Sequence, residues 1–155
     1  MIADVPVRLA TLADAVEIAA MSRDYIERGL PWTWTEARVA HSIREPETNV
    51  VVAAENGGIT GFGIMYYASD DAHLLLFAVR SAHRRRGVGS AILRWLEDVA
   101  RAAGAKRIRV ECTRENAAGR NFYCEHGYHE LDIAKRMYRG LKDGVRLEKW
   151  FRENA

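Results

Sequence analysis

The segment of this sequence best suited to bind an anion lies between residues 84 and 90. It reads Arg-Arg-Arg-Gly-Val-Gly-Ser, so three guanidinium groups precede two glycines. Glycines let backbone N–H groups come close to a ligand, and a helix that begins here adds unpaired N–H donors and the positive end of its dipole. The combination predicts a site for a phosphate or pyrophosphate group.

Two common phosphate-binding patterns do not fit this segment. The third glycine of the dinucleotide pattern Gly-x-Gly-x-x-Gly would fall at position 92, which is Ile92. No Gly-Lys-Ser or Gly-Lys-Thr follows, so the P-loop pattern is excluded as well. On spacing alone, a basic turn that caps a helix is the alternative interpretation.

The residues on either side of this segment predict the elements that position it. The apolar run from His73 to Val79 predicts a buried strand. His73 itself is expected to be a solvated histidine at the strand end, with relay of a proton as the alternative. After the segment, apolar residues recur at spacings of three and four, which predicts an amphipathic helix over residues 91–103 that ends at Gly104. Its apolar face is expected to comprise Val88, Ile92, Trp95, Leu96 and Val99.

The remaining chain predicts alternating strands and helices. Asn56-Gly57-Gly58 is a hairpin signal, and Gly61 and Gly63 are expected at a bulge or a close approach. The strand over 105–112 should run parallel to the one over 73–79, because a helix crosses between them. Further strands are expected over 6–10, 49–55, 59–68, 128–133 and 145–151, helices over 13–28, 35–44 and 115–126, and a polar loop over 135–143. This order predicts a mixed α/β sheet with helices on both faces, in one domain over 1–155.

Composition narrows the class of protein. The 155 residues are 48% hydrophobic and carry a net charge of only +2, which disfavours a general nucleic-acid binder. Cys112 and Cys124 form no Cys-x-x-Cys pair, and no zinc-type spacing is present, so no metal is expected. We find no signal peptide and no apolar run long enough for a membrane span. A cytoplasmic protein with no membrane partner is the expectation.

Two motifs give the chain a resemblance to a known family. Arg84-x-x-Gly87-x-Gly89, between a strand and a helix, resembles the acetyl-CoA loop of the GCN5-related N-acetyltransferase (GNAT) superfamily. The stretch from Asn116 through Phe122-Tyr123 to Gly127-Tyr128 resembles that family's second pattern, with departures at Gly119, usually Ala, and Tyr128, usually Phe. The resemblance implies six to seven mostly antiparallel strands, a splayed parallel pair at the centre, and four helices on both faces.

The resemblance also implies an activity, acetyl transfer from acetyl-CoA to a primary amine by direct attack in a ternary complex. Glu111, Asn116 and Tyr123 have the spacing of the ribosomal-protein N-terminal alanine acetyltransferases. Glu111 is the candidate base, since a strand-end carboxylate beside a cleft can accept the proton of the amine. Tyr123 is the candidate acid for the leaving thiolate. The alternatives are a surface Glu111 paired with a neighbouring cation and a Tyr123 that only packs in the core.

Further residues follow from the same resemblance. Backbone groups of Phe77, Ala78 and Val79 would bind the pantetheine arm, and Asn116 would contact it or shape the strand end. The pyrophosphate would be held by the loop residues Arg84, Arg85, Arg86, Gly87, Val88, Gly89 and Ser90. No metal is required.

The acceptor is less well defined by sequence. Trp32 and Trp34 lie in a proline-containing connection and either form a wall of the acceptor pocket or fill the edge of the core. The acceptor would be a protein or peptide N-terminus or a small-molecule amine, and polyamines are disfavoured because only Glu27 and Glu36 lie nearby. The oligomeric state stays open, with a homodimer through the last strands as the option that relatives offer.

Two rival functions are retained. A non-catalytic acyl-CoA-binding sensor would keep the loop but dispense with the base and the acid. A nucleic-acid-binding domain would use Arg84–Arg86 with Trp32 and Trp34 as stacking surfaces. The presence of Glu111 and Tyr123 argues against the first, and the small net charge argues against the second.

Overall fold

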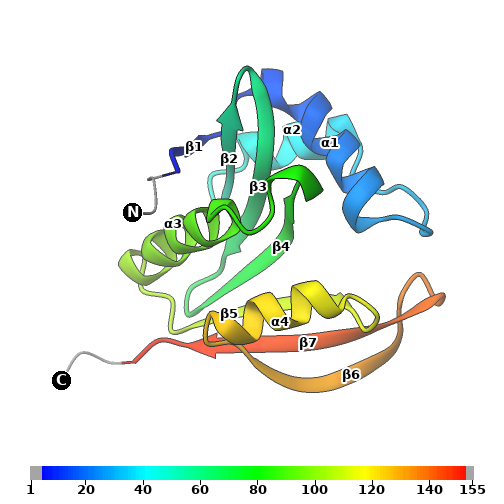
Figure 1. The fold of residues 1–155 in the computed structure, drawn as a ribbon. Helices are drawn as coiled ribbons and strands as arrows, with labels where there is room; N and C mark the ends of the chain where they lie inside the picture. Colours follow the sequence, from blue (N-terminus) through cyan, green and yellow to red (C-terminus); the bar gives the residue numbers. More distant parts are fainter. Residues whose placement is uncertain (1–4, 153–155) are drawn as a thin grey trace.

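A seven-stranded mixed sheet forms the centre of the molecule (Figure 1). The computed structural model describes residues 5–152, and the strand order is β1-β2-β3-β4-β5-β7-β6. The strands are β1 (Val7–Leu9), β2 (Thr48–Glu55), β3 (Gly58–Tyr67), β4 (Asp71–Val79), β5 (Arg107–Thr113), β6 (His129–Tyr138) and β7 (Lys142–Trp150). Only β4 and β5 pair in parallel, which confirms the predicted mostly antiparallel sheet with a central parallel pair.

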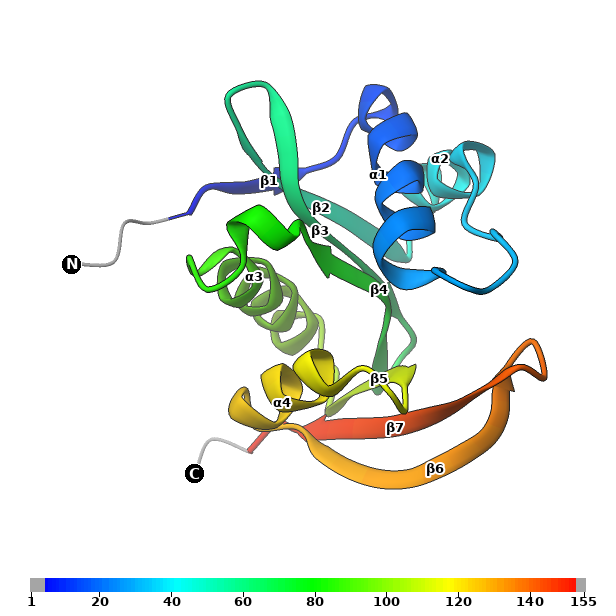
Figure 2. The ribbon, with the colours of Figure 1, turned by 45° about the vertical axis from the view of Figure 1, so that its right-hand side comes forward.

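Helices cover both faces of this sheet, as Figures 1 and 2 show. The α-helices are α1 (Ala15–Met21), α2 (Glu36–Arg44), α3 (Val88–Ala102) and α4 (Ala117–Glu125). Shorter turns are η1 (Leu12–Asp14), η2 (Ser22–Ile26) and η3 (Ser81–His83). The buried side chains of α1 and α2 form one apolar cluster with the sheet, while those of α3 and α4 form a second cluster on the other face.

Two glycines of β3 allow α3 to lie close to the sheet. A Cβ atom at Gly61 would lie 2.9 Å from Ile92 Cδ1, and one at Gly63 would lie 2.8 Å from Leu96 Cδ1. Real Cβ contacts are essentially never shorter than 3.0 Å, so any larger residue would push the helix outward. The predicted close approach is therefore confirmed.

The parallel pair separates part-way along its length. Pairing between β4 and β5 runs from Asp71↔Arg107 to Leu74↔Val110 and stops there. On the other edge of β4, Leu74 pairs with Met65 and Leu76 pairs with Ile64, so Leu75 is an extra residue in a β-bulge. A bulge bends its strand and breaks the ladder locally. From Leu75 onward, the β5-facing edge of β4 has no partner in β5.

The last hairpin differs from the sequence prediction. The loop expected over 135–143 is wrong, because β6 continues to Tyr138 and β7 begins at Lys142. β6 is the edge strand of the sheet and most of its side chains are exposed, so its sequence is polar and resembles a loop. The turn forms where Arg139 and Gly140 adopt positive φ values of 56° and 71°.

Two helix predictions also need correction. The single helix expected over 13–28 is divided into η1, α1 and the π-type turn η2. On α3, Trp95 and Val99 are only half-buried. The face buried against the sheet instead includes Leu93, Ala100 and the charged Glu97. Glu97 is tolerated there because the Tyr128 hydroxyl donates to it at 2.8 Å and Lys149 Nζ lies 3.1 Å away.

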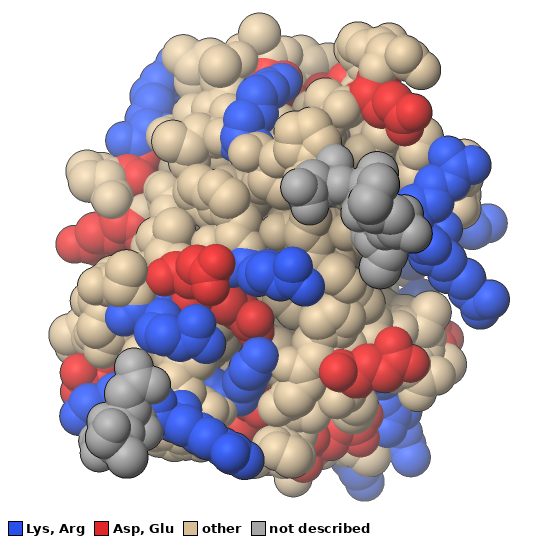
Figure 3. All heavy atoms as spheres, turned by 60° about the vertical axis from the view of Figure 1, so that its left-hand side comes forward, with Lys and Arg blue, Asp and Glu red and all other residues tan. Residues whose placement is uncertain are grey.

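Two further features of the fold concern its helices and its surface charge. No helix within residues 5–152 is long and apolar enough to cross a membrane. Figure 3 shows acidic and basic side chains interspersed on the side of the molecule that lies to the left in Figure 1. On that side of the molecule, the mixed charges form no continuous basic surface of the kind that binds a nucleic-acid backbone.

Candidate active site

Glu111 and His73 meet at the point where the two parallel strands diverge. In the register of the parallel pair, His73 lies opposite Arg109. Glu111 is two residues further along β5, so its side chain lies on the same face of the sheet as that of Arg109. Glu111 Oε2 lies 2.5 Å from His73 Nε2, and the side chains are 21% and 25% exposed. Since a carboxylate can only accept, the His73 Nε2–H donates. The expectation that His73 is a solvated strand-end residue is wrong, and so is the surface pairing of Glu111 with a lysine or arginine.

A cavity of about 250 Å³ lies against this pair. Its lining residues are Trp34, Arg38, His73, Leu75, Glu111, Met137 and Tyr138. They come from the α1–α2 connection, α2, β4, β5 and β6, so segments far apart in sequence line one small, open pocket. Apolar walls with a few polar groups directed to one side are typical of small-molecule sites.

The two tryptophans of the α1–α2 connection have different surroundings. Trp34 is 8% exposed and belongs both to the apolar cluster and to the cavity wall. Trp32 is 42% exposed, its indole N–H donates to the carbonyl of Ala19 at 3.2 Å, and it is not among the residues that line the cavity. The structure therefore brings only one of the two predicted acceptor residues to this cavity.

A buried carboxylate holds this connection in place. Glu27 accepts hydrogen bonds from the backbone N–H of Thr33 at 2.8 Å and of Trp34 at 3.1 Å, and from the Thr33 hydroxyl. The Ser22 hydroxyl donates to the other side of the same carboxylate at 3.3 Å. Charge-assisted bonds of this kind are stronger than neutral ones, so Glu27 fixes the position of Trp34.

Tyr123 is buried beneath the diverging strands in an aromatic group. Its ring centroid lies 5.6 Å from that of Phe122 and 6.1 Å from that of Phe77. Burial raises its pKa well above the ordinary value for tyrosine, and the nearby charges of Cys112, Tyr138 and Glu111 raise it further. Tyr123 is therefore a neutral phenol throughout the working pH range, within electrostatic reach of Glu111.

The basic loop leads into α3 through left-handed backbone. Arg85 and Gly87 have φ values of 64° and 82°, and Gly87 is the N-cap of α3. A Cβ atom at Gly89 would lie 3.2 Å from ring atoms of both Phe77 and Phe122, so glycine keeps the first turn of α3 close to β4 and α4. The Ser90 hydroxyl lies 2.8 Å from His126 Nε2, so its side chain is engaged with α4.

A comparison with protein families decides the identity of this fold. The model of the acetyltransferase (GNAT) family matches residues 16–128. The chain belongs to this family. An uncharacterized N-acetyltransferase of Bacillus subtilis, YhfO, is 28% identical over 134 residues, which is 80% of this chain and 89% of that protein. The ribosomal protein bS18-alanine N-acetyltransferase of Salmonella typhimurium is 27% identical over 122 residues, or 77% and 82% of the two chains.

Solved structures of the family share this architecture. Ard1 from Thermoplasma volcanium superposes with a TM-score of 0.83 at 22% identity, covering 96% of this chain and 98% of that one. The PaiA N-acetyltransferase from Thermoplasma acidophilum, solved in complex with coenzyme A, has a TM-score of 0.79 at 17% identity and covers 96% and 100%. These likenesses confirm the predicted GNAT fold.

The described residues of this GNAT domain fit a coenzyme A group. The β4 edge from Leu75 to Val79 offers backbone N–H and C=O groups that β5 does not use. Beyond it, α3 presents a 15-residue helix whose first turn begins at Gly87, beside the exposed side chains of Arg84, Arg85 and Arg86. An extended polar arm can pair with the strand edge, and a pyrophosphate can lie at the helix terminus.

Asn116 has a structural task of its own. Its side-chain oxygen accepts from the backbone N–H of Gly119 at 2.9 Å and so caps α4. A Cβ atom at Gly119 would lie 2.5 Å from Asn116 Nδ2, so alanine here would require the Asn116 side chain to shift. The predicted contact of Asn116 with pantetheine stays a prediction.

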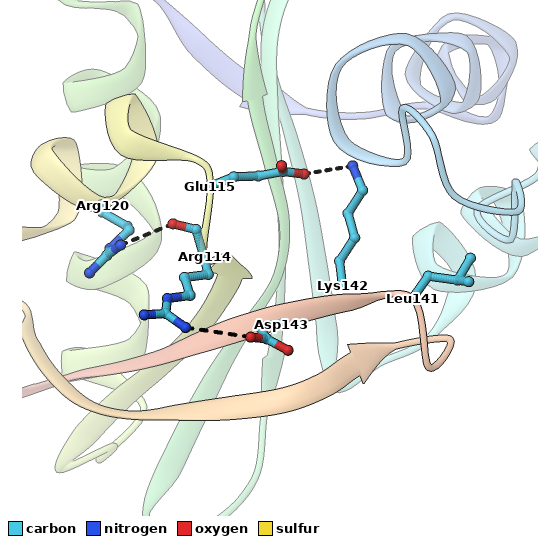
Figure 4. Close-up of a pocket in the computed structure, with 6 residues that line it drawn as sticks. All are labelled: Arg114, Glu115, Arg120, Leu141, Lys142 and Asp143. Atoms are coloured by element: carbon cyan, nitrogen blue, oxygen red, sulfur yellow. Dashed lines mark hydrogen bonds and ion pairs between the residues drawn. The ribbon is translucent and has the colours of Figure 1, made fainter.

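A second, larger cavity of about 530 Å³ has its charges paired (Figure 4). Its lining residues are Arg114, Glu115, Arg120, Leu141, Lys142 and Asp143. Lys142 Nζ lies 2.7 Å from Glu115 Oε1, Arg114 lies 3.5 Å from Asp143, and Arg120 donates to the Arg114 carbonyl at 2.9 Å. Because these groups satisfy one another, we place the chemistry in the smaller cavity.

Five cavity residues were not singled out by sequence reasoning as site residues. They are Arg38, His73, Leu75, Met137 and Tyr138. Tyr138 had a signal, because Met137-Tyr138 is a partial match to the Tyr-Tyr found in the tail of the alanine acetyltransferases. Arg38 had none, since it lies on the exposed face of an ordinary amphipathic helix.

Proposed function

We propose that this GNAT acetyltransferase transfers an acetyl group from acetyl-CoA to a primary amine held in the cavity beside Glu111, by direct attack in a ternary complex. The observation that supports this most strongly is the Glu111–His73 pair on the wall of a cavity at the divergence of β4 and β5. When bound, acetyl-CoA supplies the thioester that the amine attacks.

Glu111 acts as the base in this proposal. The amine must lose a proton to attack, and free α-amino groups have a pKa of about 7.7–8.0 while lysine-type amines have one of about 10.4. A carboxylate within hydrogen-bond reach, directly or through one water, can accept that proton. The hydrogen bond from His73 orients the carboxylate and leaves its second oxygen free for the amine.

Tyr123 assists the departing sulfur. Because its pKa is raised by burial, the phenol keeps its proton and can donate a hydrogen bond to a developing thiolate. A thiol has a pKa of about 8.5, so complete transfer of the phenol proton is uphill. The role proposed for Tyr123 is therefore stabilisation of negative charge more than delivery of the proton itself.

The rest of the site holds the two substrates in position. The free edge of Phe77, Ala78 and Val79 binds the pantetheine arm, and the loop from Arg84 to Ser90 binds the pyrophosphate through backbone N–H groups. Trp34 forms a wall for the acceptor. Correct placement of two reactants alone can supply about 7–11 kcal/mol of the barrier.

Calorimetric titration of acetyl-CoA tests the cofactor site. We expect micromolar binding that weakens at high salt, since phosphate contacts are screened. Gly89→Asp and the exposed Arg86→Glu place negative charge at the proposed pyrophosphate site, and both should lose affinity. Ala102→Asp, which adds the same charge at the far end of α3, about 20 Å away, should bind like the wild type.

A turnover assay distinguishes a transferase from a non-catalytic acyl-CoA sensor. Release of free thiol from acetyl-CoA in the presence of an amine, with the acetylated amine detected by mass spectrometry, supports the transferase. Binding of acetyl-CoA without turnover of amines or N-terminal peptides would favour the non-catalytic acyl-CoA sensor. Absence of binding would refute the proposal.

A further inference from the structure

We propose that the acceptor is a small zwitterion, an α-amino acid with an apolar or aromatic side chain, whose carboxylate is bound by Arg38. This inference rests on the proposed function and adds the class of acceptor. It depends on three features of the 250 Å³ cavity: its unpaired cation, its apolar walls and its size.

The cation of the cavity is free to receive an anion. Arg38 lies on α2, and its guanidinium carbon is 3.8 Å from the centroid of the Trp34 ring, so the group stacks on the indole. Stacking occupies the face of a guanidinium and leaves the N–H groups along its edge available. Within residues 5–152, the only hydrogen bond from these groups goes to the Thr33 hydroxyl at 3.4 Å, and no carboxylate is paired with Arg38.

The cavity also contains one carboxylate, that of Glu111, which is already bonded to His73. A substrate whose amine lies beside Glu111 therefore enters a cavity that has one further charged group, Arg38. Arg38 is exposed and hydrated, so an amine without an anionic group can still bind but makes no ion pair with it. A carboxylate carried by the same molecule matches it, and arginine binds carboxylates in a two-point geometry.

The remaining walls select the side chain of the acceptor. Trp34, Leu75, Met137 and Tyr138 surround the charged groups with apolar and aromatic surface. The pocket is open to solvent, and its volume of about 250 Å³ lies below the range of about 300–1,000 Å³ for sites of drug-sized ligands, which is room for a molecule as small as one amino acid.

A contact between two loops favours a small molecule over a peptide. Lys142, at the β6–β7 turn, donates from Nζ to the carbonyl of Arg28 in the α1–α2 connection at 3.3 Å. The same Nζ is paired with Glu115 at 2.7 Å, as Figure 4 shows. This contact joins the segments that supply Trp34 and Tyr138 to the cavity wall, and so restricts the route an extended chain would need.

The test compares acceptors that differ only at the carboxylate. Leucine, methionine and phenylalanine are each assayed against their primary amides, their decarboxylated amines and a pentapeptide that begins with the same residue. The amine of an amide is less basic than that of the free acid, so intrinsic reactivity favours the amide. A preference for the acid must therefore come from the protein.

We expect kcat/KM for the best acid to exceed that for its amide and amine by about tenfold or more, as one charge-assisted pair allows. Arg38→Gln should lose that factor for the acid and change the amide by less than about twofold, with Arg38→Lys intermediate. Arg44→Gln, at an exposed arginine one and a half turns further along α2, is the matched control and should change neither.

Each contrary result has a distinct meaning. Equal or better turnover of amides, amines or the peptide by the wild type would overturn the amino-acid assignment and leave the transferase intact. The same holds if Arg38→Gln lowers turnover of the acid and amide equally. Acetyl-CoA binding with no acetylation of any amine in the panel overturns the inference, whereas failure to bind acetyl-CoA refutes the proposed function itself.

Discussion

Replacing Tyr123 with phenylalanine removes one hydroxyl group and keeps the aromatic packing. The ring is held between Phe77, Phe122 and Tyr128, with centroid separations of 6.1, 5.6 and 5.6 Å. In the described part of the chain, the Tyr123 hydroxyl makes no hydrogen bond. We therefore expect the free energy of unfolding to change by less than about 1 kcal/mol.

The effect on turnover should be much larger than the effect on stability. Burial raises the pKa of Tyr123, so the hydroxyl keeps its proton, and in the proposed mechanism it donates to the departing thiolate. Hydrogen bonds to charged groups contribute about 1.5–3 kcal/mol. Loss of that stabilisation corresponds to a fall in kcat of about 10- to 150-fold. The affinity for acetyl-CoA and the KM for the amine should stay unchanged.

The pH dependence gives an independent check on the same group. Because the pKa is raised, the protonated phenol persists above the ordinary tyrosine value of about 10. Wild-type kcat should therefore show no decline from ionisation of Tyr123 up to pH 10.

Tyr128→Phe provides the matched control. It removes a hydroxyl that donates to the buried Glu97, so we expect a loss of about 1–3 kcal/mol in stability with kcat retained. Urea denaturation and steady-state kinetics on both variants separate the two effects. Full turnover by Tyr123→Phe would refute the proposed role of its hydroxyl.

Three further predictions concern the base, the core and the thiols. Glu111→Gln should lower kcat/KM by about 10²–10⁴-fold near pH 7. The activity of this variant should recover as the pH rises, because the amine then loses its proton unaided. An equal loss at every pH of the pH–rate profile would contradict the role of Glu111 as the base. Gly63→Ala should lower the free energy of unfolding, measured by urea denaturation, by about 1–3 kcal/mol, because its Cβ would lie 2.8 Å from Leu96. In the control Gly58→Ala, the new Cβ has no contact nearer than 3.8 Å, so stability should change by less than about 0.5 kcal/mol. At pH 8.5, iodoacetamide should modify the exposed Cys124 and spare Cys112, because burial raises the pKa of the Cys112 thiol to about 11 and keeps it protonated. Equal labelling of the two cysteines, measured by mass spectrometry, would contradict this prediction.

The elements that sequence predicted well are those with strong local signals. Asn56 and Gly57 adopt φ values of 53° and 82°, the left-handed pair that a tight hairpin needs. The order of strands and helices through α3, β5 and α4 followed from apolar periodicity and from Gly104 and Gly127 at helix ends. β6 was missed over its second half, because an exposed edge strand has no alternating apolar pattern.

The candidate site was less accessible to sequence because its contacts join distant residues. His73 and Glu111 are 38 residues apart, and only the parallel register of β4 and β5 brings them together. From the sequence, Glu27 is expected only to add negative charge near the acceptor. In the structure, its carboxylate accepts hydrogen bonds from the backbone N–H groups of Thr33 and Trp34. Motifs identified the candidate catalytic residues, but the partners that orient them required the fold.

The bulge at Leu75 explains how one strand, β4, contributes both to the cavity beside Glu111 and to the packing beneath the basic loop. Before it, Leu74 belongs to the α3 cluster and His73 faces the acceptor cavity. After it, the alternation is reset, so that Leu76 joins the α1–α2 cluster and Phe77 packs beneath Gly89. Without the bulge, regular alternation from His73 onward would turn Phe77 to the opposite face, away from the first turn of α3. The bulge thus places His73 and Phe77 on opposite faces of β4, and in the proposed mechanism the amine and the thioester meet at the unpaired edge between them.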